Sequence, residues 1–280
     1  MTVKNLCCPI CGTSLGLSEN GRSLICQKEI KPHCFDLASA GYVNLDRQHS
    51  GGGDSKECVK SRSAFLALGH YEPISKRINE LASNFCLHGG NILDAGCGEG
   101  YYTLSLANVL SSSPVFGVDI SKPAIEHAAK EAKKSGAGNL FYSVSSIYEL
   151  PLQSGSVDCI TNIFAPCPEK EFFRVLRDGG VLIVAAAGEK HLLGLKKALY
   201  DNVYMNETRA DMPKNMGFSE EHRSILSYSI NLKSQKEISD LFSMTPYYYR
   251  TSLRDKEKLA SLKQLETRIE IEFTVYRKNG

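Results

Sequence analysis

The stretch Ile92-Leu-Asp-Ala-Gly-Cys-Gly-Glu-Gly-Tyr-Tyr-Thr103 places three glycines within five residues, directly after a short apolar run. Glycines gather in this way where a backbone must turn sharply or come close to a ligand. The spacing argues against both common phosphate loops. A Walker loop needs a lysine after its last glycine, and a dinucleotide fingerprint is Gly-x-Gly-x-x-Gly rather than Gly96-x-Gly98-x-Gly100. Asp94 on the preceding strand would also repel a pyrophosphate, whereas it suits a cationic amino-acid end.

Strands and helices alternate along the chain from this stretch onward. Strands are predicted at residues 92–95, 115–120, 140–144, 158–164 and 181–186. A helix is predicted after the second strand, with Ser121 as its N-cap and Gly136 after its end. This alternation is typical of parallel β-α-β units. Residues 269–276 instead alternate apolar and polar side chains, so we expect an antiparallel last strand with one polar face.

The second predicted strand ends in an acidic residue, Asp119, 19 residues after Gly100. A carboxylate at this point can accept hydrogen bonds from both ribose hydroxyls of an adenosine. Asp94, the glycine loop and Asp119 together resemble the S-adenosylmethionine site of class I methyltransferases. The alternative is a structural tight turn followed by a solvated aspartate. We therefore predict an α/β fold with a Rossmann-like, mostly parallel sheet, and S-adenosylmethionine as its cofactor.

Charge and hydropathy restrict the class of protein. The formal net charge is only +2 and no three basic residues are consecutive, so a nucleic-acid partner is neither indicated nor excluded. No apolar run approaches the roughly 20 residues of a membrane helix, and the first residues lack the apolar region of a signal peptide. The sequence thus predicts a cytoplasmic protein without a membrane partner.

Five of the ten cysteines lie in the first 34 residues. Cys8-Pro-Ile-Cys11 is a CxxC knuckle, and Cys26 with His33 or Cys34 follows about 15 residues later. Two ligands on one tight turn and two more at this distance are typical of tetrahedral zinc. Unligated thiols and a redox CxxC are the alternatives, and the latter lacks a thioredoxin-like context. The pattern predicts a small zinc-ribbon-like domain.

These patterns divide the chain into three parts. Residues 1–45 form the predicted zinc-binding domain, residues 46–85 a flexible loop with linking helices, and residues 86–280 the methyltransferase domain. The loop is predicted at 46–55, where turn-forming residues predominate and nothing apolar is available for burial. Gly69 and Pro73 divide the helical pattern after it into two helices.

With the zinc knuckle upstream of the glycine loop, the chain resembles the bacterial 23S rRNA (guanine-N1)-methyltransferases of hairpin 35, which include the tylosin-resistance type. The resemblance covers nearly the whole chain. It rests on these segments: Cys8-Pro-Ile-Cys11, His33-Cys-Phe-Asp-Leu-Ala38, Gly41-Tyr-Val-Asn-Leu45, Gly53-Asp-Ser55, Arg62-Ser-Ala-Phe-Leu-Ala-Leu-Gly-His-Tyr71, Leu93 to Thr103, Ala165-Pro-Cys167, His191-Leu-Leu-Gly-Leu-Lys196 and Met244-Thr-Pro246.

The resemblance also assigns candidate cofactor-binding residues. The family's contacts to S-adenosylmethionine map onto Tyr71, Gly98, Glu99 and His191, and Asp119 joins them from its position on the second strand. Taken alone, Tyr71 would be a core or helix-end aromatic, and His191 a surface histidine. No side chain identifies itself as a catalytic base, so the catalytic residues stay unassigned.

The family's zinc ligands map onto Cys8, Cys11, Cys26 and His33. The segment between Cys26 and His33 is longer than the family's usual three residues, which leaves Cys34 as an alternative fourth ligand.

The resemblance implies methyl transfer from S-adenosylmethionine to N1 of a guanine in hairpin 35 of 23S rRNA, at position 745 or 748. The RNA would be free or part of a ribosomal particle, gripped by the zinc module and the 46–55 loop, and the enzyme is compatible with a homodimer. The main alternative is a methyltransferase for a small molecule or a protein. A non-catalytic zinc-ribbon RNA-binding protein and a zinc-containing NAD-dependent oxidoreductase are further alternatives, which the intact glycine loop and its spacing disfavour.

Overall fold

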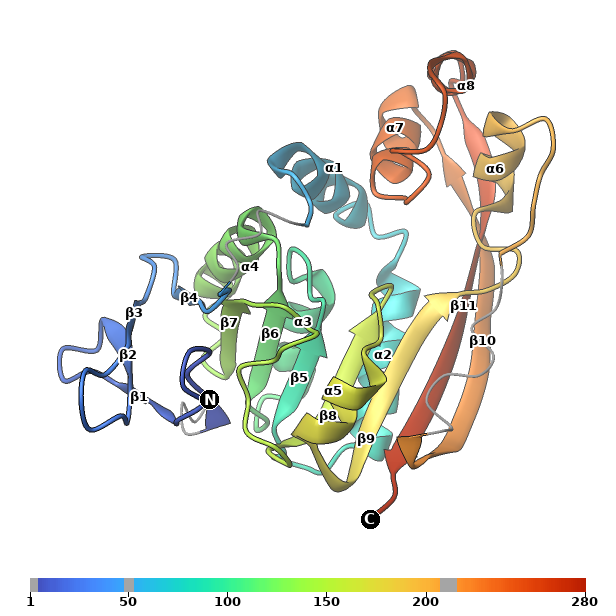
Figure 1. Ribbon diagram of the computed structural model, residues 1–280. Coiled ribbons are helices and arrows are strands. Elements are labelled where there is room, and N and C mark those ends of the chain that lie inside the picture. Colours follow the sequence, from blue (N-terminus) through green and yellow to red (C-terminus); the bar gives the residue numbers. More distant parts are fainter. Residues whose placement is uncertain (1–4, 48–52, 207–215) are drawn as a thin grey trace.

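The computed structural model describes residues 5–47, 53–206 and 216–280, and its centre is a single long sheet flanked by helices (Figure 1). The eight strands of this sheet lie in the order β10-β11-β9-β8-β5-β6-β7-β4. Their bounds are β4 Tyr42–Asn44, β5 Ile92–Ala95, β6 Val115–Asp119, β7 Leu140–Val144, β8 Val157–Ile163, β9 Leu176–Ala187, β10 Phe218–Leu232 and β11 Leu265–Lys278.

The sheet is parallel from β4 to β9, and β11 runs antiparallel to both of its neighbours, β9 and β10. The predicted fold class, a mostly parallel Rossmann-like sheet with an antiparallel last strand, is therefore confirmed. The predicted alternation in β11 is also seen, because Ile269, Ile271, Phe273 and Val275 are all fully buried. Glu270 and Glu272 between them are only partly buried, but Thr274 and Tyr276 are buried too, so the predicted polar face holds for the first part of the strand and is wrong for residues 274 and 276.

Eight helices within the described ranges cover or extend this sheet. Their bounds are α1 Lys56–Leu66, α2 Glu72–Phe85, α3 Tyr101–Val109, α4 Lys122–Ser135, α5 Glu169–Val175, α6 Leu193–Leu199, α7 Gln235–Ser243 and α8 Leu253–Ala260. On one face, Ile78 of α2 and Leu106 of α3 share a core with Ile92 and Val115 of the sheet. None of the helices in the described ranges is long and apolar enough to cross a membrane.

The helix after β6 begins and ends at the residues that the sequence predicts. Ser121 is the N-cap of α4, and its hydroxyl accepts a hydrogen bond from the amide of Ala124 at 3.2 Å. Gly136 ends the helix in the left-handed conformation, with φ +74°. The predicted division of the following segment into two helices is also seen, since α1 ends at Leu66 and α2 begins at Glu72. Pro73 lies in the first turn of α2, where its missing N–H costs nothing.

The N-terminal module is a three-stranded antiparallel sheet, formed by β1 Leu15–Leu17, β2 Ser23–Cys26 and β3 Cys34–Asp36. Its apolar side chains do not form a separate core. Leu6, Leu15 and Leu24 are buried together with Leu93 and Phe116 of the large sheet. The module therefore covers the sheet face opposite α2 and α3.

Two structural features cross the division made from the sequence. β4, within the segment assigned to the zinc-binding domain, pairs in parallel with β7 and forms the edge of the large sheet. In the predicted flexible loop, residues 48–52 lie outside the described residues, but its end is packed: Ser121 donates a hydrogen bond from its hydroxyl to the carbonyl of Asp54 at 2.8 Å. A Cβ on Gly53 would lie 2.8 Å from that of Ser121. This end of the loop is held against the start of α4.

Candidate functional site

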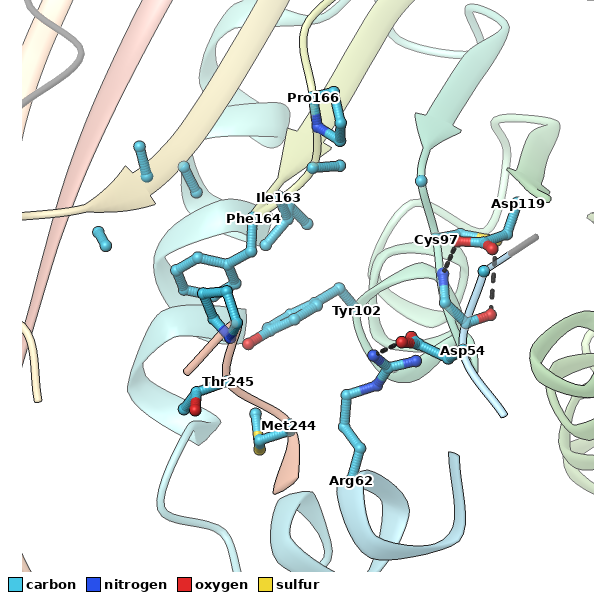
Figure 2. A pocket seen from close by; sticks show the side chains of 18 of the residues that line it. Asp54, Arg62, Cys97, Tyr102, Asp119, Ile163, Phe164, Pro166, Met244 and Thr245 are labelled. Atoms are coloured by element: carbon cyan, nitrogen blue, oxygen red, sulfur yellow. Dashed lines mark hydrogen bonds and ion pairs between the residues drawn. The ribbon is translucent and has the colours of Figure 1, made fainter. Parts of the chain in front are cut away.

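A cavity of about 800 Å³ opens at the carboxyl ends of β5, β6, β8 and β9 (Figure 2). This is the edge of a parallel sheet where α/β proteins bind ligands. One wall is formed by the glycine loop and Asp119, and the opposite one by residues 163–166 after β8. Residues 53–54 and residues 244–247 contribute further parts of the lining from distant positions in the sequence.

The three loop glycines have positive φ angles of +80°, +54° and +83°. Each also lies against another part of the protein. A Cβ on Gly96 would lie 2.6 Å from that of Ala165, and one on Gly98 would lie 3.0 Å from Nη2 of Arg62. A Cβ on Gly100 would lie 2.6 Å from the hydroxyl of Tyr142. Internal packing therefore requires glycine at positions 96 and 100, whereas at position 98, where the nearest atom is the end of an arginine side chain, the left-handed backbone is the main reason for glycine.

Asp119 holds the loop in shape from the end of β6. Its carboxylate accepts hydrogen bonds from the amides of Gly98 at 2.9 Å and Ser121 at 2.8 Å. Each oxygen has a second lone pair that can accept from a ligand hydroxyl. Burial raises the pKa of Asp119, whereas these two backbone hydrogen bonds lower it. The side chain lies at the end of β6 and lines the cavity, and its ribose-binding role stays a prediction.

Asp94, in contrast, is engaged within the protein. It is 2% exposed and accepts hydrogen bonds from the hydroxyls of Thr103 at 2.5 Å and Thr161 at 2.8 Å. Burial raises its pKa to about 6, partly offset by these two hydroxyls. Asp94 thus ties α3 and β8 to β5 beneath the glycine loop.

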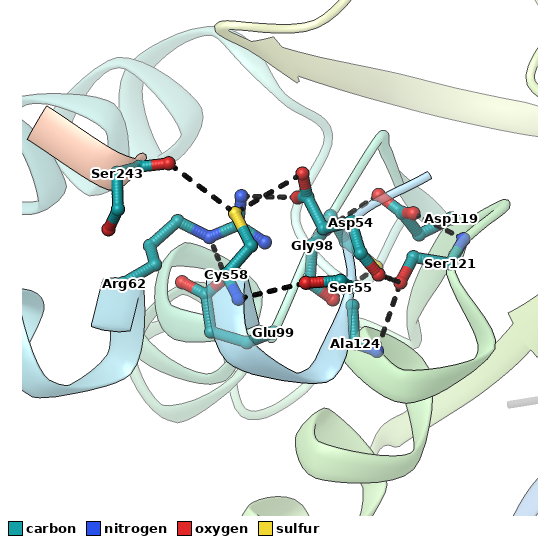
Figure 3. A network of polar contacts seen from close by, with 11 residues as sticks. Asp54, Ser55, Cys58, Arg62, Gly98, Glu99, Asp119, Ser121, Ala124 and Ser243 are labelled. Carbon is teal, nitrogen blue, oxygen red and sulfur yellow. Dashed lines mark hydrogen bonds and ion pairs between the residues drawn. The ribbon is translucent and has the colours of Figure 1, made fainter. Parts of the chain in front are cut away.

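Glu99 lies in a network of charges that the sequence did not indicate (Figure 3). Arg62 of α1 forms an ion pair with Glu99 through Nε, and its Nη1 lies 2.5 Å from Oδ2 of Asp54. Its third nitrogen, Nη2, is buried and has no hydrogen-bond partner among the described residues. Arg62 therefore joins α1, residues 53–54 and the glycine loop, and retains one donor at the cavity.

An aromatic wall faces the glycine loop. Tyr71, the N-cap of α2, is 2% exposed, and its ring centroid lies 6.4 Å from those of both Phe164 and His191. Phe164 has a positive φ of +53°, is 43% exposed and stacks on His191 at 6.0 Å. The left-handed backbone of a bulky residue is rare, and it turns Phe164 toward the cavity here (Figure 2).

His191 is a buried, neutral hydrogen-bond donor. Its Nδ1 accepts a hydrogen bond from the amide of Glu270 at 3.3 Å, so the ring proton resides on Nε2. Burial, and to a smaller extent the charge of Lys196, lowers the pKa of His191 to about 3. His191 is buried and lines the cavity. The expectation that His191, taken without the family resemblance, would be a surface histidine is therefore wrong.

The predicted metal ligands also converge. One nitrogen or sulfur atom from each of Cys8, Cys11, Cys26 and His33 lies within 4.8 Å of all the others. Nδ1 of His33 is 3.4 Å from the sulfur of Cys8 and 3.5 Å from that of Cys26. Zinc bonds of about 2.3 Å to sulfur and 2.0 Å to nitrogen separate tetrahedral ligands by about 3.5–3.8 Å, so the cluster fits zinc.

The same geometry distinguishes His33 from Cys34. Cys34 is exposed on β3 and lies outside the cluster. The amide of His33 donates a hydrogen bond to the sulfur of Cys26 at 3.0 Å, an arrangement that stabilises a thiolate. The cluster cysteines are free thiols, whereas the sulfurs of Cys86 and Cys159 elsewhere in the chain lie within bonding distance.

Comparisons with known proteins agree with this architecture. A family model described as a methyltransferase domain matches residues 87–244, and one described as "RlmA, N-terminal", a zinc ribbon, matches residues 6–46. A 23S rRNA (guanine(748)-N(1))-methyltransferase of Streptomyces fradiae is 32% identical over 201 residues, which cover 70% of this chain and 68% of the relative. The chain belongs to the 23S rRNA (guanine-N1)-methyltransferase family.

Two further proteins are similar to this chain, one in sequence over nearly its whole length and one in fold. A "Putative 23S rRNA (guanine-N(1)-)-methyltransferase YxjB" of Bacillus subtilis (strain 168) is 28% identical over 271 residues, covering 93% of this chain and 91% of the relative. The solved structure of a "putative methyltransferase" from Bacillus halodurans C-125 superposes with a TM-score of 0.50 at 15% identity. The superposition covers 72% of this chain and 98% of the Bacillus halodurans chain, and it supports the fold alone.

For this member of the family, the structure gathers all five predicted cofactor-binding residues, Tyr71, Gly98, Glu99, Asp119 and His191, around one cavity. Their roles in cofactor binding stay predictions. Sequence reasoning missed three groups that also line it. Asp54 lay in the supposed mobile loop, Arg62 was only part of a family segment, and Tyr102 was an ordinary helix residue. No spacing rule relates these positions to the glycine loop.

Proposed function

We propose that this chain transfers a methyl group from S-adenosylmethionine to N1 of a guanine in hairpin 35 of 23S rRNA. The observation that carries the proposal is the pairing of two unlike walls in one cavity. One wall offers the glycine loop and the Asp119 carboxylate to an adenosine, and the other offers the exposed ring of Phe164 to a base. Family membership supplies the acceptor, ribosomal guanine N1.

The predicted cofactor residues fit S-adenosylmethionine by their chemistry. Asp119 would accept from the ribose hydroxyls, and the Gly98 and Glu99 segment would line the methionine portion. The free Nη2 of Arg62 would donate to the methionine carboxylate, which supplies the partner that this buried nitrogen lacks. When bound, the cofactor supplies an electrophilic methyl group on a sulfonium. Tyr71 and His191 would close the cavity and exclude water with their rings.

The proton on guanine N1 must leave as the methyl group arrives. His191 does not serve as its base in this arrangement, because Nε2 already carries the ring proton and Nδ1 is occupied by the Glu270 amide. In this proposal the proton is released to water, and the protein contributes mainly by holding the two reactants at near-attack distance. A guanine within a hairpin reaches the cavity only after leaving its stack.

Cys8, Cys11, Cys26 and His33 would hold one structural zinc ion. All four positions are protein ligands, so no coordination site stays open for catalysis. The ion would stabilise the fold of the ribbon on the order of 10 kcal/mol. A ribosomal substrate further implies a cytoplasmic location. The proposed substrate is the RNA either free or within a ribosomal particle. The proposed enzyme is compatible with a homodimer.

The target guanine is at position 745 or 748, and the Streptomyces fradiae relative, which is named for 748, favours that position. A methyl group on N1 removes the Watson–Crick donor, so reverse transcription stops one nucleotide before the modified base. The stop should vanish in a deletion strain and return with the intact gene. A Gly98→Asp version should not restore it, since a side chain at this φ of +54° is strained and its carboxylate would pair with the Arg62 nitrogen that we propose for the methionine carboxylate. A stop that persists after deletion would refute the proposed acceptor.

A further inference from the structure

Tyr102 presents a buried hydroxyl to the cavity without any hydrogen-bond partner among the described residues. Its ring is fixed, because it packs on the core beneath α3 and meets Tyr101 edge-on at a centroid distance of 5.0 Å. A buried hydroxyl without a partner costs free energy. A fixed, unpaired donor in a cavity is therefore a strong indication of a polar ligand atom at that place.

The direction of the side chain distinguishes the acceptor side of the cavity from the cofactor side. In Figure 2, Tyr102 points from α3 toward Phe164 and Thr245, away from Asp119, which ends β6 on the other side. The hydroxyl thus faces the wall after β8, where Phe164 offers its exposed ring. A base lying against Phe164 would present the atoms of its edge toward Tyr102.

We propose that the Tyr102 hydroxyl donates a hydrogen bond to O6 of the target guanine, and so acts as a positioning and specificity-determining residue. The inference rests on the proposed function. In the transfer, the N1–H bond breaks and its proton goes to water, while the N1 electron pair forms the bond to the methyl carbon. The C–S bond breaks with its electron pair on sulfur, so the sulfonium becomes a neutral thioether. As N1 loses its proton, negative charge spreads to O6.

A neutral donor at O6 stabilises this charge and discriminates guanine from adenine, which has a donor at the same position. The phenol stays protonated in its role as donor. Burial raises the pKa of Tyr102 well above its usual value, and the nearby Tyr71 and Glu99 raise it further.

The experiment compares Tyr102→Phe with Tyr101→Phe in the full, zinc-loaded chain. The two tyrosines are neighbours on α3, and Tyr101 does not line the cavity. Methylation of a hairpin 35 transcript should slow about 10- to 100-fold in kcat for Tyr102→Phe, the scale for one hydrogen bond to a developing charge. For Tyr102→Phe, the part of the pH profile in which kcat rises with pH should also move to higher pH. Tyr101→Phe should keep the wild-type rate, and S-adenosylmethionine affinity should change less than twofold in both.

Other results of this comparison would refute either the role of Tyr102 or the proposed function. If wild type methylates the transcript and Tyr102→Phe does so within twofold, the role of Tyr102 is refuted while the proposed function stands. If wild type itself is inactive on ribosomal RNA, the proposed function fails first. Weaker cofactor binding with an unchanged kcat would assign the hydroxyl to S-adenosylmethionine and refute the guanine contact. If Tyr102→Phe fails to fold, or its thermal midpoint is lower by several degrees, the hydroxyl has a partner within the protein. That result would refute the premise that the hydroxyl is unpaired.

Discussion

Gly100→Ala tests whether the glycine loop is fixed by internal packing. Gly100 lies at the start of α3 with φ +83°. A Cβ there would lie 2.6 Å from the Tyr142 hydroxyl and 2.7 Å from the Cβ of Ala128 on α4. Non-bonded carbon atoms prefer about 3.5–4.0 Å, so the new methyl group would overlap its neighbours by about 0.8 Å or more. Both neighbours are buried and cannot move aside freely.

The magnitude follows from three contributions. Overpacking a filled core costs about 1–3 kcal/mol. The left-handed backbone costs alanine about 1–2 kcal/mol more than glycine. The lower entropy of the unfolded chain returns about 0.4–1 kcal/mol. The free energy of unfolding of Gly100→Ala should therefore be about 1–5 kcal/mol lower than that of wild type.

Gly136→Ala is a matched control. Gly136 has a similar φ of +74°, but a Cβ there would meet no atom within 4 Å. This variant has the backbone cost without the overlap, so its free energy of unfolding should fall by at most about 1.6 kcal/mol. The two variants differ by the overpacking cost of about 1–3 kcal/mol, so the midpoint of thermal unfolding should be about 2–12 °C lower for Gly100→Ala than for Gly136→Ala, at roughly 2–4 °C per kcal/mol for large domains. Equal midpoints for the two variants would refute the packing explanation for Gly100.

Three further predictions concern the cofactor, the metal and proton binding. Asp119→Ala should weaken S-adenosylmethionine binding by about 1.5–3 kcal/mol in calorimetry, and unchanged affinity would remove Asp119 from the site. X-ray absorption should show one zinc with three sulfur ligands and one nitrogen, retained in Cys34→Ser and lost in His33→Ser; four sulfurs would contradict the assignment of His33. His191 has a folded pKa of about 3, below its unfolded value of about 6.5, so the unfolded state binds more protons between these values. Between pH 7 and 5, wild type should therefore lose about 2 kcal/mol more unfolding free energy than His191→Gln, and parallel pH curves would refute the buried neutral imidazole.

Local patterns were sufficient for the sheet and for part of the site. The N-cap at Ser121, the carboxylate at the end of β6 and the alternation in β11 each follow from residues close together in the sequence. The ligands Cys8 and Cys11 are likewise adjacent on one turn. In these cases the signal is a spacing that one helix, strand or turn imposes, so it survives without knowledge of the tertiary structure.

The remaining features depend on contacts between distant segments. Arg62 reaches Glu99 across 37 residues, and its place over Gly98 follows from how α1 packs beside α4. The three residues of β4 are too few to indicate a strand, and their partner β7 lies about 100 residues later. Tyr102 has the character of a core residue in the sequence. Only the cavity beside it shows that its hydroxyl lacks a partner.

The N-terminal module covers part of the large sheet where a connecting helix is absent. Residues 145–156 connect β7 to β8 without a helix, so this connection leaves the sheet face beneath it uncovered. The ribbon occupies that face: Leu6 forms a β-bridge with Leu152, and Cys7 donates its amide to the carbonyl of Pro151 at 2.9 Å. Cys8 and Cys26, two of the proposed zinc ligands, are themselves buried in the core that contains Leu93, one residue before Asp94. Metal binding would therefore stabilise the floor of the cavity through apolar packing, without any proposed zinc ligand lining the cavity itself.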